Sequence, residues 1–150
     1  MPLRDDLLNP ISEANPGGEN LRFAPVYDKI KEARREDDDA PQGEWQRARK
    51  TADWPLVIKL ASEALATKSK DLQIAAWLTE ALLRKEGIPG FREGLSLIAA
   101  LLDTFWDSLY PELEDGDPEL RAVPLVWREG RMEAALRSAP LVKKGYNSFY

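Results

Sequence analysis

The sequence predicts an all-α fold: a single domain of about five to seven helices packed as antiparallel helical hairpins. Three observations lead to this prediction. Apolar residues recur at helical spacing over several long segments, and no segment shows the alternation typical of a half-buried strand. The connections between the helices expected to begin near residues 53, 71 and 91 are short, and they are polar or contain Gly and Pro. The chain has 150 residues, which suits one domain with a substantial core.

Residues 1–23 are expected to form an ordered, irregular loop packed on the helices. Pro10 and Pro16 interrupt regular structure, and Gly17 and Gly18 can adopt a positive φ, so replacing both glycines with valine should destabilise the domain. A flexible linker would be polar throughout, whereas apolar side chains in this stretch gain free energy by leaving water. These side chains are Leu7, Leu8, Ile11, Leu21 and Phe23.

The first helix is expected to begin at Pro25, because proline suits a first helical turn and apolar residues follow at helical spacing. The acidic run at 37–39 should end this helix, and a solvated helix end explains that run better than a metal site does. A further short helix is expected over residues 44–50, and it would carry Trp45.

Two strong helical patterns follow. Asp53 is expected to cap one helix whose first turn contains Pro55, and a second helix should run from about Asp71 to Glu86. Gly87 should end the second helix, since glycine is favoured just after a helix C-terminus.

The next helix is expected from about Phe91 to Tyr110, where Pro111 would stop it. Because it is apolar around most of its circumference, we expect it at the centre of the fold. A last helical segment should span residues 118–138 and be kinked or divided at Pro124. Residues 139–150 have no helical period and are expected to be a tail that continues into a longer protein.

The composition excludes several classes of chemistry. The chain contains no His and no Cys, so Ser-His-Asp and Cys-His catalysis and the usual zinc ligand sets are impossible within it. The net charge is −5, and five acidic residues lie between residues 112 and 119, which argues against a nucleic-acid-binding surface. The sequence also lacks an apolar run near the ~20 residues that a membrane span needs. No cofactor or metal is predicted, and a cytoplasmic location is expected.

The five tryptophans are the most conspicuous candidates for a binding site. Trp77, Trp106 and Trp127 lie among aliphatic residues on expected helices, so core packing is the favoured interpretation. Trp45 and Trp54 lie near helix starts beside the irregular region. They either wedge the N-terminal loop in place or contact a partner, and the sequence leaves both open.

Several stretches together resemble a known family. The most specific are PISEANPGGENLR, the helix start ADWP, the helix SKDLQIAAWLTEALL and the helix end FWDSLYP. Over about residues 7–141 they are similar to the ImpA N-terminal domain, which opens the TssA proteins of bacterial type VI secretion systems.

The resemblance implies a non-enzymatic assembly component that acts in the cytoplasm on a contractile, phage-tail-like machine. It also implies partners among the baseplate, membrane-complex, tube and sheath subunits, and rings formed through a C-terminal region. The partner-binding candidates are Glu19, Asn20, Arg22, Trp45 and Trp54. Two alternatives remain: a small-ligand-binding or carboxylate-dependent enzyme domain in an interhelical pocket, and a domain that only tethers its neighbours.

Overall fold

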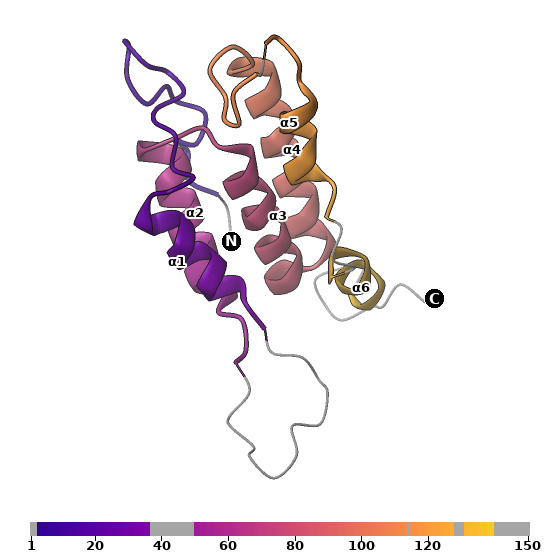
Figure 1. Cartoon of the computed structure of the whole chain (residues 1–150). Coiled ribbons are helices and arrows are strands. Elements are labelled where there is room, and N and C mark those ends of the chain that lie inside the picture. Colours follow the sequence, from indigo (N-terminus) through magenta and orange to yellow (C-terminus); the bar gives the residue numbers. More distant parts are fainter. Residues whose placement is uncertain (1–2, 37–49, 114, 128–130, 140–150) are drawn as a thin grey trace.

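The computed structural model describes residues 3–36, 50–113, 115–127 and 131–139, and it confirms the all-α prediction. In this part of the chain every regular element is a helix, as Figure 1 shows. The elements are α1 (Pro25–Arg34), α2 (Trp54–Thr67), α3 (Leu72–Glu86), α4 (Ile88–Thr104), α5 (Glu119–Ala122), the 3-10 helix η1 (Val123–Leu125) and α6 (Arg131–Ser138). No helix among the described residues is long and apolar enough to cross a membrane.

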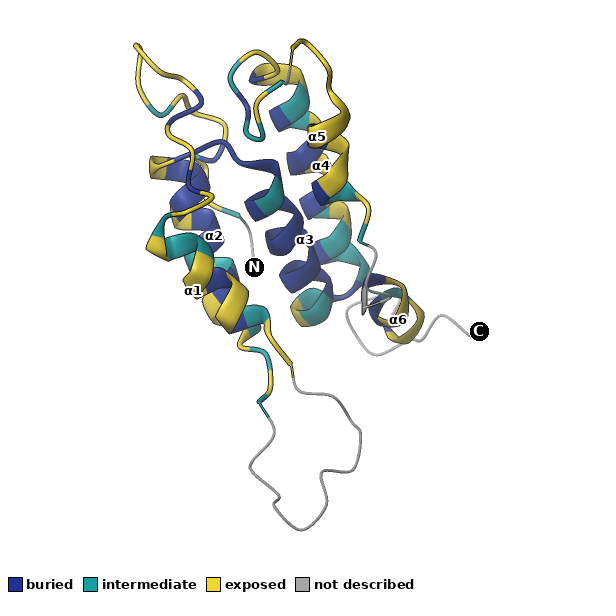
Figure 2. Ribbon diagram, in the orientation of Figure 1, coloured by how far each residue is buried: buried dark blue, intermediate teal, exposed yellow. Residues whose placement is uncertain are grey.

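The central helix is α3, and the prediction that the following helix lies at the centre is wrong. α3 contacts α1, α2, α4, η1 and α6, and nearly every residue of α3 is buried (Figure 2). α4 is also rich in apolar residues, but among the described residues it packs mainly on α3, and its Leu95 is 42% exposed. An apolar residue pattern around most of a helix was therefore not enough to predict which helix lies at the centre of the fold.

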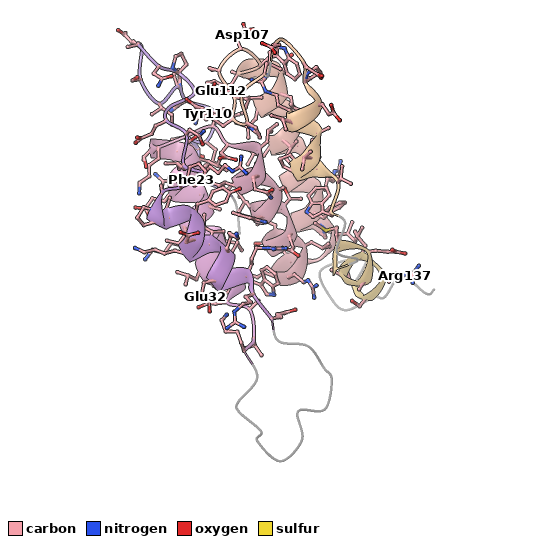
Figure 3. All side chains as sticks on the ribbon, viewed as in Figure 1. Phe23, Glu32, Asp107, Tyr110, Glu112 and Arg137 are labelled. Carbon is pink, nitrogen blue, oxygen red and sulfur yellow. The ribbon has the colours of Figure 1, made fainter. Side chains whose placement is uncertain are left out.

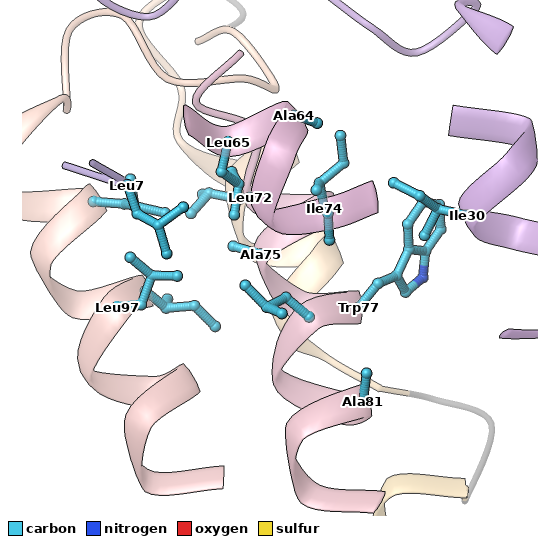
Figure 4. Packing of buried hydrophobic residues seen from close by; sticks show 14 of the residues in the cluster. Leu7, Ile30, Ala64, Leu65, Leu72, Ile74, Ala75, Trp77, Ala81 and Leu97 are labelled. Carbon is cyan, nitrogen blue, oxygen red and sulfur yellow. The ribbon is translucent and has the colours of Figure 1, made fainter. Parts of the chain in front are cut away.

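The main hydrophobic core joins the N-terminal loop to the helices, which confirms that the loop is packed. Leu7 and Leu21 from the loop are 3% and 4% exposed and pack in the same cluster as Ile30 of α1 and Trp77 of α3 (Figure 4). Phe23 does not join them, since it is 89% exposed. Leu8 is also exposed, at 41%. Burial of Leu7 and Leu21, at ~25 cal/mol per Å² of apolar surface, helps to fix an otherwise irregular segment.

The helix N-termini agree well with the sequence prediction. The Asp53 carboxylate accepts a hydrogen bond from the Leu56 N–H at 3.1 Å and caps α2. Asp71 caps α3 by accepting from the N–H groups of Gln73 (2.8 Å) and Ile74 (3.3 Å). These bonds satisfy donors that the first turn of a helix leaves open.

Gly87 ends α3 with φ 74°, as expected, but α4 begins at once. Its start at Ile88 is earlier than the expected Phe91, because Pro89 lies in its first turn, where proline needs no N–H donor. α4 also ends earlier than expected, at Thr104 rather than near Tyr110. The prediction that Pro124 divides the last segment is confirmed, since η1 contains Pro124 and separates α5 from α6.

Candidate functional site: a groove beside the N-terminal loop

The two adjacent glycines of the N-terminal loop lie against the backbone of the α2–α3 connection and of the turn after α4. The Gly17 carbonyl accepts a hydrogen bond from the Lys70 N–H at 2.7 Å, and the Glu19 N–H donates to the Lys68 carbonyl at 3.0 Å. A Cβ atom on Gly17 would lie 2.0 Å from the Ser108 carbonyl oxygen. Only glycine permits this close approach between backbones.

The side chain of Lys70 fixes the start of the loop. It is fully buried, and its Nζ donates to the carbonyl oxygens of Leu7 at 2.7 Å and Leu65 at 2.6 Å. It also lies over the Phe105 ring, 5.2 Å from the centroid. Burial lowers the pKa of Lys70 to about 8. A buried ammonium is costly unless it is hydrogen-bonded, and here two carbonyls and an aromatic face surround it.

Tyr110 connects the loop, the start of α3 and the turn after α4. Its N–H donates to the Lys70 carbonyl at 3.0 Å, its carbonyl accepts from Leu72 at 2.8 Å, and its hydroxyl donates to the Gly18 carbonyl at 3.0 Å. The Tyr110–Pro111 peptide bond is cis. Three segments that are distant in sequence thus share one hydrogen-bonded junction.

Arg121 attaches α5 to this junction. Its guanidinium is buried and donates to the carbonyl oxygens of Pro111 (2.9 Å), Leu109 (3.0 Å) and Trp106. It also lies over the Trp106 ring, 4.7 Å from the centroid. Trp106 itself is 41% exposed, so the prediction that it packs in the core is wrong. The planar fork of an arginine suits three carbonyls at once, which a lysine cannot reproduce.

A groove of about 510 Å³ lies between the N-terminal loop and the α5–η1 segment. Asn20, Arg22 and Tyr27 line one side, and Leu120, Val123 and Pro124 line the other. Between them are Asp71, Gln73, Tyr110, Pro111, Glu112 and Leu113. Figure 3 labels Phe23, Tyr110 and Glu112 along this upper part of the molecule. Tyr110 and Pro111 of the junction thus lie in the lining between the two walls.

The groove has exposed apolar side chains at its edges. Leu120 is 43% exposed and Val123 is 53% exposed, and both line it. Phe23 directly follows the lining residue Arg22, whose guanidinium lies 5.5 Å from the Phe23 ring centroid. Exposed apolar residues that gather beside polar ones are typical of interaction surfaces.

The polar groups of the groove have shifted proton affinities. Burial raises the pKa of Asp71 to about 6, against the opposing effect of its two N–H bonds. Burial and then the charge of Asp71 raise the pKa of Tyr27 to about 12, while Arg22 opposes this. Burial, followed by the charges of Glu112 and Glu19, also raises the pKa of Tyr110. Burial is thus the main cause of all three shifts, and nearby carboxylates add to it at Tyr27 and Tyr110.

Comparison with known proteins identifies the family. Residues 8–130 match the family described as ImpA, N-terminal, type VI secretion system. The chain belongs to this family.

Two relatives agree with this assignment. The "Type VI secretion system component TssA1" of Pseudomonas aeruginosa is 31% identical over 118 residues, which cover 77% of this chain and 34% of that protein. A solved N-terminal domain, which includes the conserved ImpA_N region of the TssA component from Burkholderia cenocepacia, is 42% identical with a TM-score of 0.78. That match covers 93% of this chain and 52% of the solved one. The chain thus spans about one third and one half of the two matched lengths.

The structure of this ImpA N-terminal domain places two of the five partner-binding candidates in the groove. Asn20 and Arg22 line it, and the Asn20 side-chain oxygen accepts from the Arg22 N–H at 3.0 Å. Glu19 is exposed next to them. Trp54 lies elsewhere, half-buried against the core with the Arg84 guanidinium 5.5 Å from its ring centroid. Trp45, the acidic run at 37–39 and the expected helix at 44–50 lie outside the described residues, apart from Lys50.

Sequence reasoning missed the opposite wall of the groove. Leu120 and Val123 read as ordinary helix positions, and nothing local in the sequence places them beside the N-terminal loop. The one hint in the sequence was Pro124, which interrupts the helical segment. The apolar residues next to it then cannot belong to one long amphipathic helix face, and this could have marked them as exposed.

A separate cavity of about 650 Å³ lies between α2 and α3 and is lined mainly by apolar surface. Its walls include Leu3, Ile58 and Leu82, and Lys59 and Lys85 are also part of the lining. Among the residues described, no cluster of three or more acidic side chains is arranged to hold a metal ion.

Proposed function

We propose that this ImpA N-terminal domain is a non-enzymatic adaptor of a TssA-like component of a type VI secretion system. In this proposal it acts in the cytoplasm and docks on a baseplate, membrane-complex, tube or sheath subunit while the contractile machine assembles. Membership of the ImpA N-terminal family supports the assignment to a type VI secretion system. The choice of partner, the location and the absence of catalysis are parts of the proposal.

The groove beside the N-terminal loop supports docking through one particular surface. Its first wall comes from the loop that also carries the strongest family motif, and its second wall exposes Leu120 and Val123. Both walls are held by buried or partly buried hydrogen bonds, from Tyr110 and from Arg121, and these bonds form without a partner. A preorganised surface loses less conformational entropy on association.

The test is recovery of secretion-system subunits from the producing bacterium, with the 150-residue chain as bait. Leu120→Glu places a charge in the groove, and Leu95→Glu is the matched control, because the two leucines are 43% and 42% exposed and Leu95 does not line the groove. We expect the unchanged chain and Leu95→Glu to recover the same subunit, quantified by mass spectrometry. Leu120→Glu should reduce this recovery at least tenfold.

Two outcomes would contradict the proposal. If no secretion-system subunit is recovered in repeated experiments, the adaptor role is not supported. If Leu120→Glu recovers as much as Leu95→Glu, the docking surface lies elsewhere. Intact secretion after deletion of the domain would favour the third interpretation, a domain without a partner of its own.

The alternative of a small-ligand site has one concrete location, the apolar cavity beside Ile58 and Leu82. A ligand that binds the folded state raises its melting temperature by mass action. A thermal-shift screen of metals, nucleotides and metabolites therefore tests it, and an unchanged melting temperature across the screen removes its support.

A further inference from the structure

We propose that the groove receives a protein segment carrying one arginine or lysine next to an aliphatic residue, with the basic group beside Asp71. This inference rests on the proposed docking function and specifies the chemistry of the partner. Three features of the groove carry it: the environment of Asp71, the balance of charge along the lining, and the apolar shoulder beside it.

Asp71 is 4% exposed and nevertheless lines the groove. Both of its N-cap hydrogen bonds, from Gln73 and Ile74, are accepted by Oδ1. Within the described residues, Oδ2 accepts no hydrogen bond and no lysine or arginine forms an ion pair with the carboxylate. A buried carboxylate without a cation is costly, and a cation brought by a partner would offset that cost.

The other polar groups along the lining also favour a donor. Tyr27 lines the groove, its hydroxyl has no hydrogen-bond partner among the described residues, and the negative charge of Asp71 acts on it. Glu112 is exposed in the lining, and the charge of Glu19 acts on Tyr110 from nearby.

Arg22 is the one basic residue among the described lining residues. It is exposed, and its guanidinium lies over the Phe23 ring rather than in an ion pair with Asp71. Acidic groups therefore predominate around the groove, which complements a basic side chain and disfavours an acidic one. Tyrosine faces also attract a guanidinium or ammonium group.

The shoulder formed by Leu120 and Val123 requires an apolar group on the same occupant. A free amine or an inorganic cation would leave these side chains in water. A peptide chain presents a basic and an aliphatic side chain together, and the lining of the groove contains both Asp71 and the two apolar residues. These contacts favour a protein segment as the occupant.

The test is selection of displayed random 12-residue peptides on the immobilised 150-residue chain, followed by binding measurements with the enriched sequences as synthetic peptides. We expect the enriched peptides to share an arginine or lysine adjacent to Leu, Ile or Val. Asp71→Asn should weaken their binding at least tenfold. Asparagine is also a good N-cap, so this variant should keep α3 intact, which circular dichroism checks.

The matched control is Asp53→Asn, which makes the same change at the N-cap of α2, away from the groove. It should leave peptide affinity unchanged. The inference is overturned if selection yields no binder, if the enriched peptides lack a basic residue, or if Asp71→Asn and Asp53→Asn bind them equally well.

Failure of this inference is distinguishable from failure of the adaptor proposal. If Leu120→Glu abolishes subunit recovery while Asp71→Asn does not, the groove binds a partner that places no basic side chain beside Asp71. In that case the adaptor proposal stands and the inference falls. If neither variant changes subunit recovery, the groove is not the docking surface. This inference and docking through the groove are then both wrong, while an adaptor role through another surface stands.

Discussion

The hydroxyl of Tyr110 donates a hydrogen bond to the carbonyl oxygen of Gly18 at 3.0 Å, although 92 positions separate the two residues. This bond joins the N-terminal loop to the turn that follows α4. The Tyr110 N–H also bonds to Lys70, so the same residue ties both segments to the start of α3. The junction positions the groove wall formed by Asn20 and Arg22.

Substituting alanine for either loop glycine should destabilise the domain by at least about 2 kcal/mol. A Cβ at Gly17 would lie 2.0 Å from the Ser108 carbonyl oxygen, and one at Gly18 would lie 2.1 Å from the Lys68 carbonyl oxygen. Gly18 also has φ 76°, which other residues rarely adopt. Urea unfolding of each variant measures the loss, and the Val-Val double variant should be less stable still.

Gly116→Ala is the control that distinguishes backbone strain at a positive φ from a steric clash of the added Cβ. Gly116 has φ 80°, but an added Cβ would meet no atom within 4 Å. We expect this change to cost about 1 kcal/mol, the price of the backbone conformation alone. Equal losses at Gly116 and Gly18 would show that the close contact with Lys68 contributes nothing.

Lys70→Met should reduce the free energy of unfolding by about 2 kcal/mol, since it leaves the Leu7 and Leu65 carbonyls without their donor. The net loss is smaller than two charge-assisted hydrogen bonds, because the variant also avoids burying a charge. Hydrogen exchange should speed up around Leu7. Lys68→Met is the control, since its exposed side chain makes no hydrogen bond with the described residues. Equal stability of the two variants would contradict the role of Lys70.

Two adjacent arginines should differ sharply on truncation. Arg34 pairs with the buried Glu80 at 2.8 Å and joins α1 to α3, whereas Arg35 pairs with the exposed Glu32. Arg34→Ala should cost about 3 kcal/mol, because it removes a cation from a buried carboxylate. Arg35→Ala should cost about 0.5 kcal/mol or less. Denaturant unfolding measures both, and similar losses would contradict the importance of the Arg34–Glu80 pair.

Asp71 should make the stability depend on pH between about 4 and 6. Its pKa is raised to about 6 in the folded state from an ordinary value of 3.8, so the folded state binds more protons than the unfolded state in this window. The contribution of Asp71 is therefore fully present below pH 3.8 and is lost as pH rises through 6, by at most about 3 kcal/mol.

The matched measurement compares the unchanged chain with Asp71→Asn in urea at pH 4 and at pH 7. The stability of the unchanged chain relative to Asp71→Asn should be higher at pH 4 than at pH 7. Asp53→Asn is measured alongside as the N-cap control, because Asp53 is exposed. A relative stability that is the same at both pH values, or higher at pH 7, would show that the carboxylate is not strained by burial.

The elements that the sequence predicted well are those that local chemistry determines. Asp53 and Asp71 cap helices through their own carboxylates, Gly87 takes the positive φ that ends α3, and Pro124 cannot continue a helix. Each of these features acts within one turn of the chain. Their positions were therefore readable without any knowledge of packing.

The features that the sequence did not reveal depend on distant contacts. The Arg34–Glu80 pair spans 46 positions, and no local pattern in the sequence links the two residues. Trp106 is 41% exposed, and the group stacked on its ring, the Arg121 guanidinium, comes from 15 positions further along the chain. In the groove, Asn20 and Arg22 were predicted from the unusual loop. The opposite wall was not predicted. The position of Leu120 depends on the neighbouring Arg121, which donates hydrogen bonds to carbonyl oxygens in the turn after α4.

Site-specific photocrosslinking in the producing bacterium tests the central claim most directly. A photoreactive amino acid replaces Val123 in the groove or, in a parallel strain, Leu95 on α4, and crosslinked products are identified by mass spectrometry. We expect position 123 to crosslink to a subunit of the secretion machine and position 95 to give no such product. Crosslinks from position 95 alone, or none to the machine from position 123, would contradict docking through the groove.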